Sequence, residues 1–218
     1  MTDRIWLKSY PQGVPADIDV AQFDSLATLI DDCFTQHAAR VGYSFMGRDL
    51  SYRQVDSLSM AFGAYLQKLG LVKGDRVAVM MPNLPQYPVA VAAILRAGMV
   101  LVNVNPLYTP RELEHQLKDS GAKAIVILEN FASTLEKCLP ATAIRHVVLC
   151  AMGDQLGLFK GALVNYVVRH SKKLVPSFHI PGAVRFNEAI ARGSSATLSR
   201  PDIRSDDVAV LQYTGGTT

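Results

Sequence analysis

The chain has 218 residues, of which 49% are hydrophobic, and this length suits one large domain or two small ones with an ample core. Its 22 Lys and Arg residues against 19 Asp and Glu residues give a net charge of +3, too small to indicate a nucleic-acid-binding protein. Cys33, Cys138 and Cys150 are widely spaced and form no C-x-x-C pair. We therefore expect buried, reduced thiols and no metal site built on cysteine.

The first residues carry no recognisable targeting signal. Residues 1–13 contain Arg4 and Lys8 but no continuous apolar block, so we expect the chain to remain in the cytoplasm. The longest apolar region, 89–104, is interrupted by Arg96 and Gly98 and is shorter than the roughly 20 residues that a membrane-spanning helix needs. We expect no transmembrane helix.

The first third of the chain predicts two helices separated by a hairpin. Apolar residues at helical spacing predict a helix over 25–39, and weak alternation with a turn at Gly47 predicts a short hairpin over 43–50. Ser51 followed by Gln54 is a capping-box signature, which predicts a second helix that ends at Gly70.

The middle of the chain alternates short apolar strands with helices of about ten residues. One helix start is marked by Thr109, Pro110 and Glu112, a capping box with proline at the first helical position. Such alternation requires a parallel sheet that is covered on both faces. The sequence therefore predicts an α/β fold with a doubly wound, mostly parallel sheet flanked by helices. The predicted strands are 76–81, 99–104, 123–128 and 146–150, and the predicted helices are 85–97, 109–121 and 131–139.

The regular alternation stops over residues 152–185, which read as a basic helical insert. Between Gln155 and Asn187 there is no acidic residue. The basic residues are Lys160, Arg169, Lys172, Lys173 and Arg185. One side of the predicted helix carries Leu158, Phe159, Ala162, Leu163, Tyr166 and Val167. A basic, imperfectly amphipathic segment suits either an anionic membrane surface or a helix packed on its own domain with a solvated basic rim.

The chain ends in a short helix over 186–191, a loop over 193–205, and an apolar strand over 208–212 followed by a Gly-Gly turn. Adjacent glycines allow successive backbone N–H groups to point at one spot, where a phosphate binds, but a Gly-Gly turn also occurs as plain loop structure. No Ser-His-Asp or Cys-His set can be assembled, and the turn lacks the lysine of a Walker loop.

The terminal stretch of the chain is Tyr213, Thr214, Gly215, Gly216, Thr217 and Thr218. It resembles the opening of the phosphate-binding loop of the adenylate-forming enzymes. Residues 95–113 (LRAGMVLVNVNPLYTPREL), closing at 119–122, resemble the upstream signature of the same superfamily at the right distance from the loop. Residues 81–90 (MPNLPQYPVA) and 173–183 resemble the bacterial long-chain fatty acid–CoA ligases. The resemblance covers essentially the whole chain.

The resemblance implies a two-step reaction in which a fatty acid is activated by Mg²⁺ and ATP as an acyl-adenylate and then transferred to coenzyme A. It implies that the six terminal residues hold the β- and γ-phosphates of ATP. It also implies that these enzymes act at the cytoplasmic face of the inner membrane, which gives Lys160, Arg169, Lys172 and Lys173 a candidate role in peripheral contact with anionic lipid.

The resemblance further implies that residues 1–218 are a partial N-terminal, AMP-binding domain that ends inside the loop. The rest of the loop, the second sheet of the N-terminal region, the small C-terminal domain and the magnesium-binding and catalytic residues would lie beyond Thr218. We therefore expect this piece alone to be inactive, and its uncovered apolar surface to be exposed or covered in a homodimer. The alternatives are a fatty acyl-AMP ligase, a medium-chain or aryl-CoA ligase, and a non-catalytic module that binds a membrane or a partner.

Overall fold

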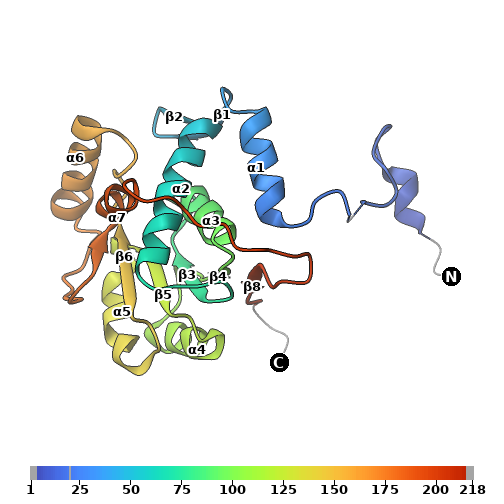
Figure 1. The fold of residues 1–218 in the computed structure, drawn as a ribbon. Helices are drawn as coiled ribbons and strands as arrows, with labels where there is room; N and C mark the ends of the chain where they lie inside the picture. Colours follow the sequence, from blue (N-terminus) through green and yellow to red (C-terminus); the bar gives the residue numbers. More distant parts are fainter. Residues whose placement is uncertain (1–3, 20, 215–218) are drawn as a thin grey trace.

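A computed structural model describes residues 4–19 and 21–214, and its centre is a six-stranded parallel sheet (Figure 1). The strand order is β7-β6-β5-β3-β4-β8, and every neighbouring pair is parallel. The strands are β3 (Arg76–Met80), β4 (Val100–Asn103), β5 (Ala124–Leu128), β6 (His146–Cys150), β7 (Val184–Arg185) and β8 (Val210–Gln212). The doubly wound sheet predicted from the alternation is confirmed.

Helices cover both faces of the sheet and create two apolar clusters. Alternate residues of each strand point to opposite faces, so Val77 of β3 packs on one face and Ala78 on the other. The first cluster joins the sheet to α2 (Tyr52–Lys68), α3 (Gln86–Arg96) and α7 (Phe186–Gly193). The second joins it to α4 (Pro110–Ser120) and α5 (Ala132–Cys138). Because both faces are covered, the buried positions of the central strands β3, β4, β5 and β6 are apolar, as the apolar runs in the sequence predicted.

Both capping boxes form. The Ser51 side chain accepts the Gln54 N–H while the Gln54 side chain accepts the Ser51 N–H, at the start of α2. Thr109 and Glu112 do the same at the start of α4. The predicted hairpin is also present, as the antiparallel pair β1 (Val41–Phe45) and β2 (Arg48–Ser51), and it lies outside the main sheet.

A buried arginine ties three helices together. Arg96, at the end of α3, is 2% exposed and forms ion pairs of 2.6 Å with Asp31 of α1 (Leu26–Gln36) and with Asp56 of α2. It also donates to Ser59 Oγ over 2.7 Å, and its guanidinium lies 4.9 Å from the ring centre of Phe34. Arg96 lies in the stretch 95–113 singled out in the sequence, and in the structure its side chain joins helices.

The basic insert contains more regular structure than the sequence analysis predicted. It holds α6 (Leu158–Tyr166), which continues into a π-helical turn η4 (Val167–Ser171), and it ends in β7, an unpredicted edge strand. β7 has only two residues, too few for an alternation to be seen in sequence. Three short 3₁₀ segments were also not predicted: η1 (Ile5–Ser9), η2 (Glu129–Phe131) and η3 (Leu139–Ala141).

Candidate functional site

At the carboxyl edge of the sheet, the chain leaves two neighbouring strands toward opposite faces. β3 continues into α3 on one face, and β4 continues into α4 on the other (Figure 1). Open parallel sheets bind ligands at such a switch point. A hollow of about 440 Å³ lies there, between the ends of β3, β4 and β8. Its polar lining is Asn83, Tyr87, Asn103, Asn105, Tyr108, Gln212 and Tyr213.

A chain of side-chain hydrogen bonds crosses this hollow and fixes β8. Tyr87 of α3 donates its hydroxyl to Asn103 Oδ1 over 2.9 Å, and Asn103 Nδ2 donates to Gln212 Oε1 over 2.8 Å. Gln116 Nε2 also donates to the Asn103 carbonyl over 2.7 Å. Among the residues that the structure describes, β8 is an edge strand that pairs only with β4 over three residues, so these contacts add to a short ladder. They position the backbone immediately before Thr214.

Of the six loop residues expected to bind phosphate, the structure describes Tyr213 and Thr214. The Tyr213 hydroxyl donates to the Asp119 carboxylate at the end of α4. Burial and this carboxylate raise the pKa of Tyr213 to about 12, so the hydroxyl stays protonated as a donor. Thr214 is exposed. The other four residues, Gly215, Gly216, Thr217 and Thr218, lie outside the described residues.

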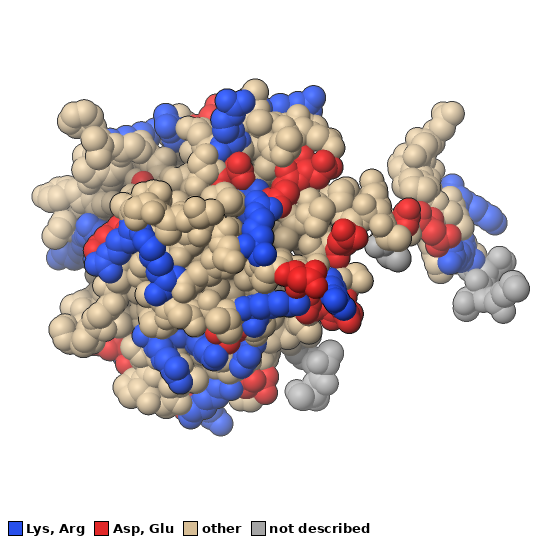
Figure 2. All heavy atoms as spheres, in the orientation of Figure 1, with Lys and Arg blue, Asp and Glu red and all other residues tan. Residues whose placement is uncertain are grey.

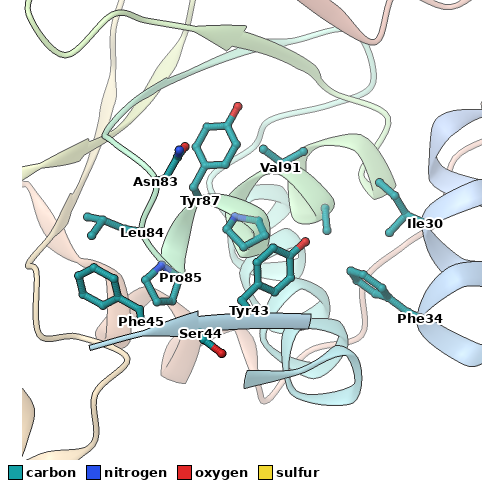
Figure 3. Close-up of a pocket in the computed structure, with 12 residues that line it drawn as sticks. Ile30, Phe34, Tyr43, Ser44, Phe45, Asn83, Leu84, Pro85, Tyr87 and Val91 are labelled. Carbon is teal, nitrogen blue, oxygen red and sulfur yellow. The ribbon is translucent and has the colours of Figure 1, made fainter. Parts of the chain in front are cut away.

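An apolar hollow adjoins the polar one. It has a volume of about 440 Å³ and lies between α1, β1 and the start of α3. Figure 3 shows Ile30 and Phe34 of α1, Tyr43 of β1 and Val91 of α3 around this space. The two hollows share Asn83 and Tyr87. An apolar space beside a polar one suits a ligand with an apolar body and a polar end.

The four cations expected at a membrane do not share one environment. Arg169 forms two hydrogen bonds of 2.7 and 2.9 Å to the carboxylate of Glu129, which is 1% exposed. Arg169 therefore has a structural partner within the domain. Lys160 is exposed, but its amino group donates to the Met46 carbonyl in the hairpin. Lys172 and Lys173 are exposed.

Glu129 also accepts from Arg185 of β7 over 2.5 Å, so one buried carboxylate ties the insert and the edge strand to the end of β5. Asp154 lies near this group. Burial, with the negative charge of Glu129, raises the pKa of Asp154 to about 6, although a hydrogen bond from the Ala151 N–H opposes the shift.

The three cysteines are free, as expected. Cys138 and Cys150 are buried, whereas Cys33 is partly exposed, so the expectation of burial is wrong for Cys33. Burial raises the pKa of the Cys138 thiol to about 11, which keeps it protonated and unreactive.

Within residues 4–19 and 21–214, no helix is long and apolar enough to cross a membrane. Over the same residues, no three His, Cys, Asp or Glu side chains gather in a way that could hold a metal ion.

Two features of this region were not predicted from the sequence. Tyr87, Asn103 and Gln212 lie on three different elements, and only the strand order brings them together. Asn103 at the end of a predicted strand was the one available signal, since ligand-facing side chains follow the carboxyl ends of parallel strands. Glu129 was missed because its basic partners lie 40 and 56 residues away.

Relatives of known function match the chain closely. It is 53% identical over 216 residues to the long-chain-fatty-acid–CoA ligase of Salmonella typhimurium, in a match that covers 99% of this chain and 38% of the relative. It is 51% identical over 217 residues to the long-chain-fatty-acid–CoA ligase of Haemophilus influenzae, in a match that covers 99% of this chain and 39% of that relative. The chain thus spans well under half the length of these relatives.

Solved structures agree in fold. The anthranilate CoA ligase bound to anthranoyl-AMP superposes with a TM-score of 0.72 at 17% identity, over 92% of this chain and 35% of that one. A long-chain-fatty-acid-CoA ligase from Archaeoglobus fulgidus superposes with a TM-score of 0.68 at 22% identity, over 96% of this chain and 37% of that one. A family profile described as "AMP-binding enzyme" matches residues 31–218. This chain therefore belongs to the family of AMP-binding enzymes.

Proposed function

We propose that this chain is part of an ATP-dependent long-chain fatty acid–CoA ligase. The observation that carries the proposal is the identity of 51 to 53% to bacterial long-chain-fatty-acid–CoA ligases across 99% of the chain. Since the chain spans 38% of the first of these relatives, the activity is proposed for a longer polypeptide, and the 218 residues alone are proposed to be inactive.

The proposed reaction has two steps. A carboxylate oxygen of the fatty acid attacks the α-phosphorus of ATP, and the bond to the bridging oxygen breaks to release pyrophosphate. The thiolate of coenzyme A then attacks the acyl carbon of the adenylate, and AMP leaves with the electron pair of the acyl–oxygen bond. Activation is needed because an oxide is a poor leaving group, whereas the phosphate of AMP is a good one.

In this proposal, the residues from Tyr213 to Thr218 hold the β- and γ-phosphates through backbone N–H groups and hydroxyls. Two features of the described residues support it: Thr214 follows a strand end at the switch point, and the adjoining hollow is lined by amides and phenols. Mg²⁺ would neutralise phosphate charge and would be held mainly by the phosphates and water, because magnesium takes few protein ligands at such sites.

The apolar hollow supports a substrate with an apolar body. Its lining is largely aliphatic and aromatic, and it meets the polar hollow at Asn83 and Tyr87. A fatty acid, with one carboxylate and a long hydrocarbon chain, has this division of character. An aryl acid has a shorter apolar body, so it matches this division between an apolar and a polar hollow less fully.

The test is acid-dependent exchange of labelled pyrophosphate into ATP by a polypeptide of the relatives' full length. Hexadecanoate should stimulate exchange, and the 218-residue chain should give none. Absence of exchange with any acid in the long form would contradict the enzyme proposal and favour a non-catalytic module. Exchange without thioester formation on adding coenzyme A would indicate a fatty acyl-AMP ligase.

We also propose peripheral contact with the cytoplasmic face of the inner membrane. Lys172 and Lys173 are exposed in a stretch without acidic residues, which supports attraction to anionic lipid. Arg169 contributes less than expected in this proposal, because its guanidinium is hydrogen-bonded to the buried Glu129 carboxylate within the domain. Liposome binding that survives Lys172→Glu and Lys173→Glu at low salt would exclude these residues as the contact.

A further inference from the structure

α6 sits on the domain with its small and polar side inward. A Cβ atom on Gly161 would lie 2.4 Å from the Gly153 carbonyl oxygen, so the helix can approach this closely only with glycine there. Asn165, one turn later, accepts the Gly153 N–H over 2.7 Å, and Val168, in η4, is buried. Gly161, Asn165 and Val168 recur at helical spacing, and they define the inner face of the helix.

The outer face of α6 is apolar, the reverse of an ordinary surface helix. Phe159, Leu163 and Tyr166 follow the i, i+4, i+7 pattern and are 93%, 63% and 62% exposed. Leu158, at the start of the helix, is 87% exposed. These four residues are called the α6 face. The apolar side predicted from the sequence is thus real, but it points away from the protein core.

The surroundings of the α6 face are basic. Lys160, Lys172 and Lys173 are exposed next to it or at the end of η4, and no acidic residue occurs between Gln155 and Asn187. α6 lies at the left of the molecule in Figures 1 and 2, on the opposite side from β8. A second copy packed here would bring like charges together, whereas an anionic lipid surface complements both the charge and the apolar stripe.

We propose that the α6 face inserts into the interface of an anionic lipid bilayer. This proposal rests on the peripheral contact proposed for Lys172 and Lys173 and adds the apolar side chains that enter the lipid. The helix lies in the plane of the membrane, with Phe159 and Leu163 among the upper acyl chains. Tyr166 and the lysine side chains reach headgroup depth, because each has an apolar body and a polar end.

The insertion is tested by placing the only tryptophan on the face. Trp6 is the single tryptophan of the chain, so Trp6→Phe with Phe159→Trp reports from α6 alone. Vesicles of phosphatidylglycerol and phosphatidylcholine should shift its emission to the blue, and brominated lipid should quench it. Pure phosphatidylcholine should do neither. The control is Trp6→Phe with Val72→Trp, since Val72 is exposed elsewhere and should report no change.

Binding is then measured by sedimentation with the same vesicles. Phe159→Ser with Leu163→Ser should weaken it by about tenfold or more, because exposed apolar area no longer enters the lipid. Ile18→Ser with Val72→Ser removes two exposed apolar side chains elsewhere and should leave binding unchanged. Neither assay contains ATP or acid, so a failure of the ligase proposal would not alter them.

Three results would overturn the proposal. The first is an unshifted emission from the Phe159→Trp variant on anionic vesicles. The second is an emission from that variant that is already blue-shifted without lipid and depends on protein concentration, which would mean that a second copy covers the face. The third is unchanged binding of the double serine variant while Lys172→Glu with Lys173→Glu abolishes it, which would mean purely electrostatic contact.

Discussion

At the scale of single residues, two buried charged side chains link separate elements of the domain through ion pairs. Arg96 joins α1, α2 and α3, and Glu129 joins the insert and β7 to the main sheet. Removing one partner of a buried ion pair costs more than the pair contributes, because the remaining charge is left without its counterion. Both groups are therefore sensitive to substitution.

Arg96→Met should lower the free energy of unfolding by about 2–4 kcal/mol. The guanidinium is almost wholly buried, while Asp31 and Asp56 retain some contact with water, which moderates the loss. Urea unfolding measures the effect. The matched control is Arg4→Met, which breaks an exposed pair with Asp17 and should cost no more than about 0.5 kcal/mol. Equal losses in the two variants would contradict a structural role for Arg96.

Asp154→Asn should stabilise the protein at pH 7 by about 1–3 kcal/mol. Because the folded-state pKa of about 6 lies above the ordinary value of 3.8, the folded protein binds the extra proton more tightly than the unfolded chain. The stability that the protonated Asp154 gives the folded protein is therefore fully present below about pH 4 and is lost as the pH rises through about 6. Thermal unfolding of the wild type and of Asp154→Asn from pH 4 to 7 tests this prediction. A difference in unfolding temperature between the two proteins that stays constant across that pH range would disprove it.

At the scale of elements, most helices and strands follow from periodicity and capping residues. Ser51 with Gln54 and Thr109 with Pro110 mark helix starts that the structure reproduces, and apolar runs mark the buried strands. β7 and the outward orientation of α6 could not be predicted in this way. A helical projection groups residues by side but does not say which side faces the core. That choice depends on the close approach of Gly161 to Gly153.

The candidate site was predictable in part. That Tyr213 and Thr214 follow a strand was expected from the sequence, and Tyr213 lines the hollow at the carboxyl edge of the sheet. The turn at Gly215 and Gly216 lies outside the described residues, so its role in phosphate binding stays a prediction. The side chains that brace the strand were not predictable, since Tyr87 and Gln212 meet Asn103 only through the strand order.

Asn103→Ala should loosen β8 selectively, because it removes the bonds to both Tyr87 and Gln212. Amide hydrogen exchange over residues 210–212 should become about tenfold faster, equivalent to about 1.4 kcal/mol. Asn187→Ala is the matched control, since it also removes two side-chain hydrogen bonds, near Asp154 at the other end of the sheet. Unchanged exchange in β8, or the same increase in the control, would exclude Asn103 as the brace.

At the scale of the whole molecule, β8 leaves one edge of the sheet unpaired within the described residues, and Val210 of β8 and the preceding Val208 are exposed there. We expect the isolated 218-residue chain to form a homodimer through this edge, since edge strands with apolar side chains tend to pair. Sedimentation equilibrium from micromolar to millimolar concentration measures it. Val208→Lys with Val210→Lys should give a monomer, and Ile18→Lys with Val72→Lys should not. A wild-type monomer throughout that range would rule out the dimer.

The most direct test of the central proposal compares acids in acyl-CoA formation by the full-length form. With ATP, Mg²⁺ and coenzyme A present, kcat/KM for hexadecanoate should exceed that for octanoate and for an aryl acid such as 4-coumarate by at least about tenfold each, since additional buried methylenes strengthen binding. A preference for octanoate or for the aryl acid, or no thioester from any of them, would contradict a long-chain fatty acid–CoA ligase.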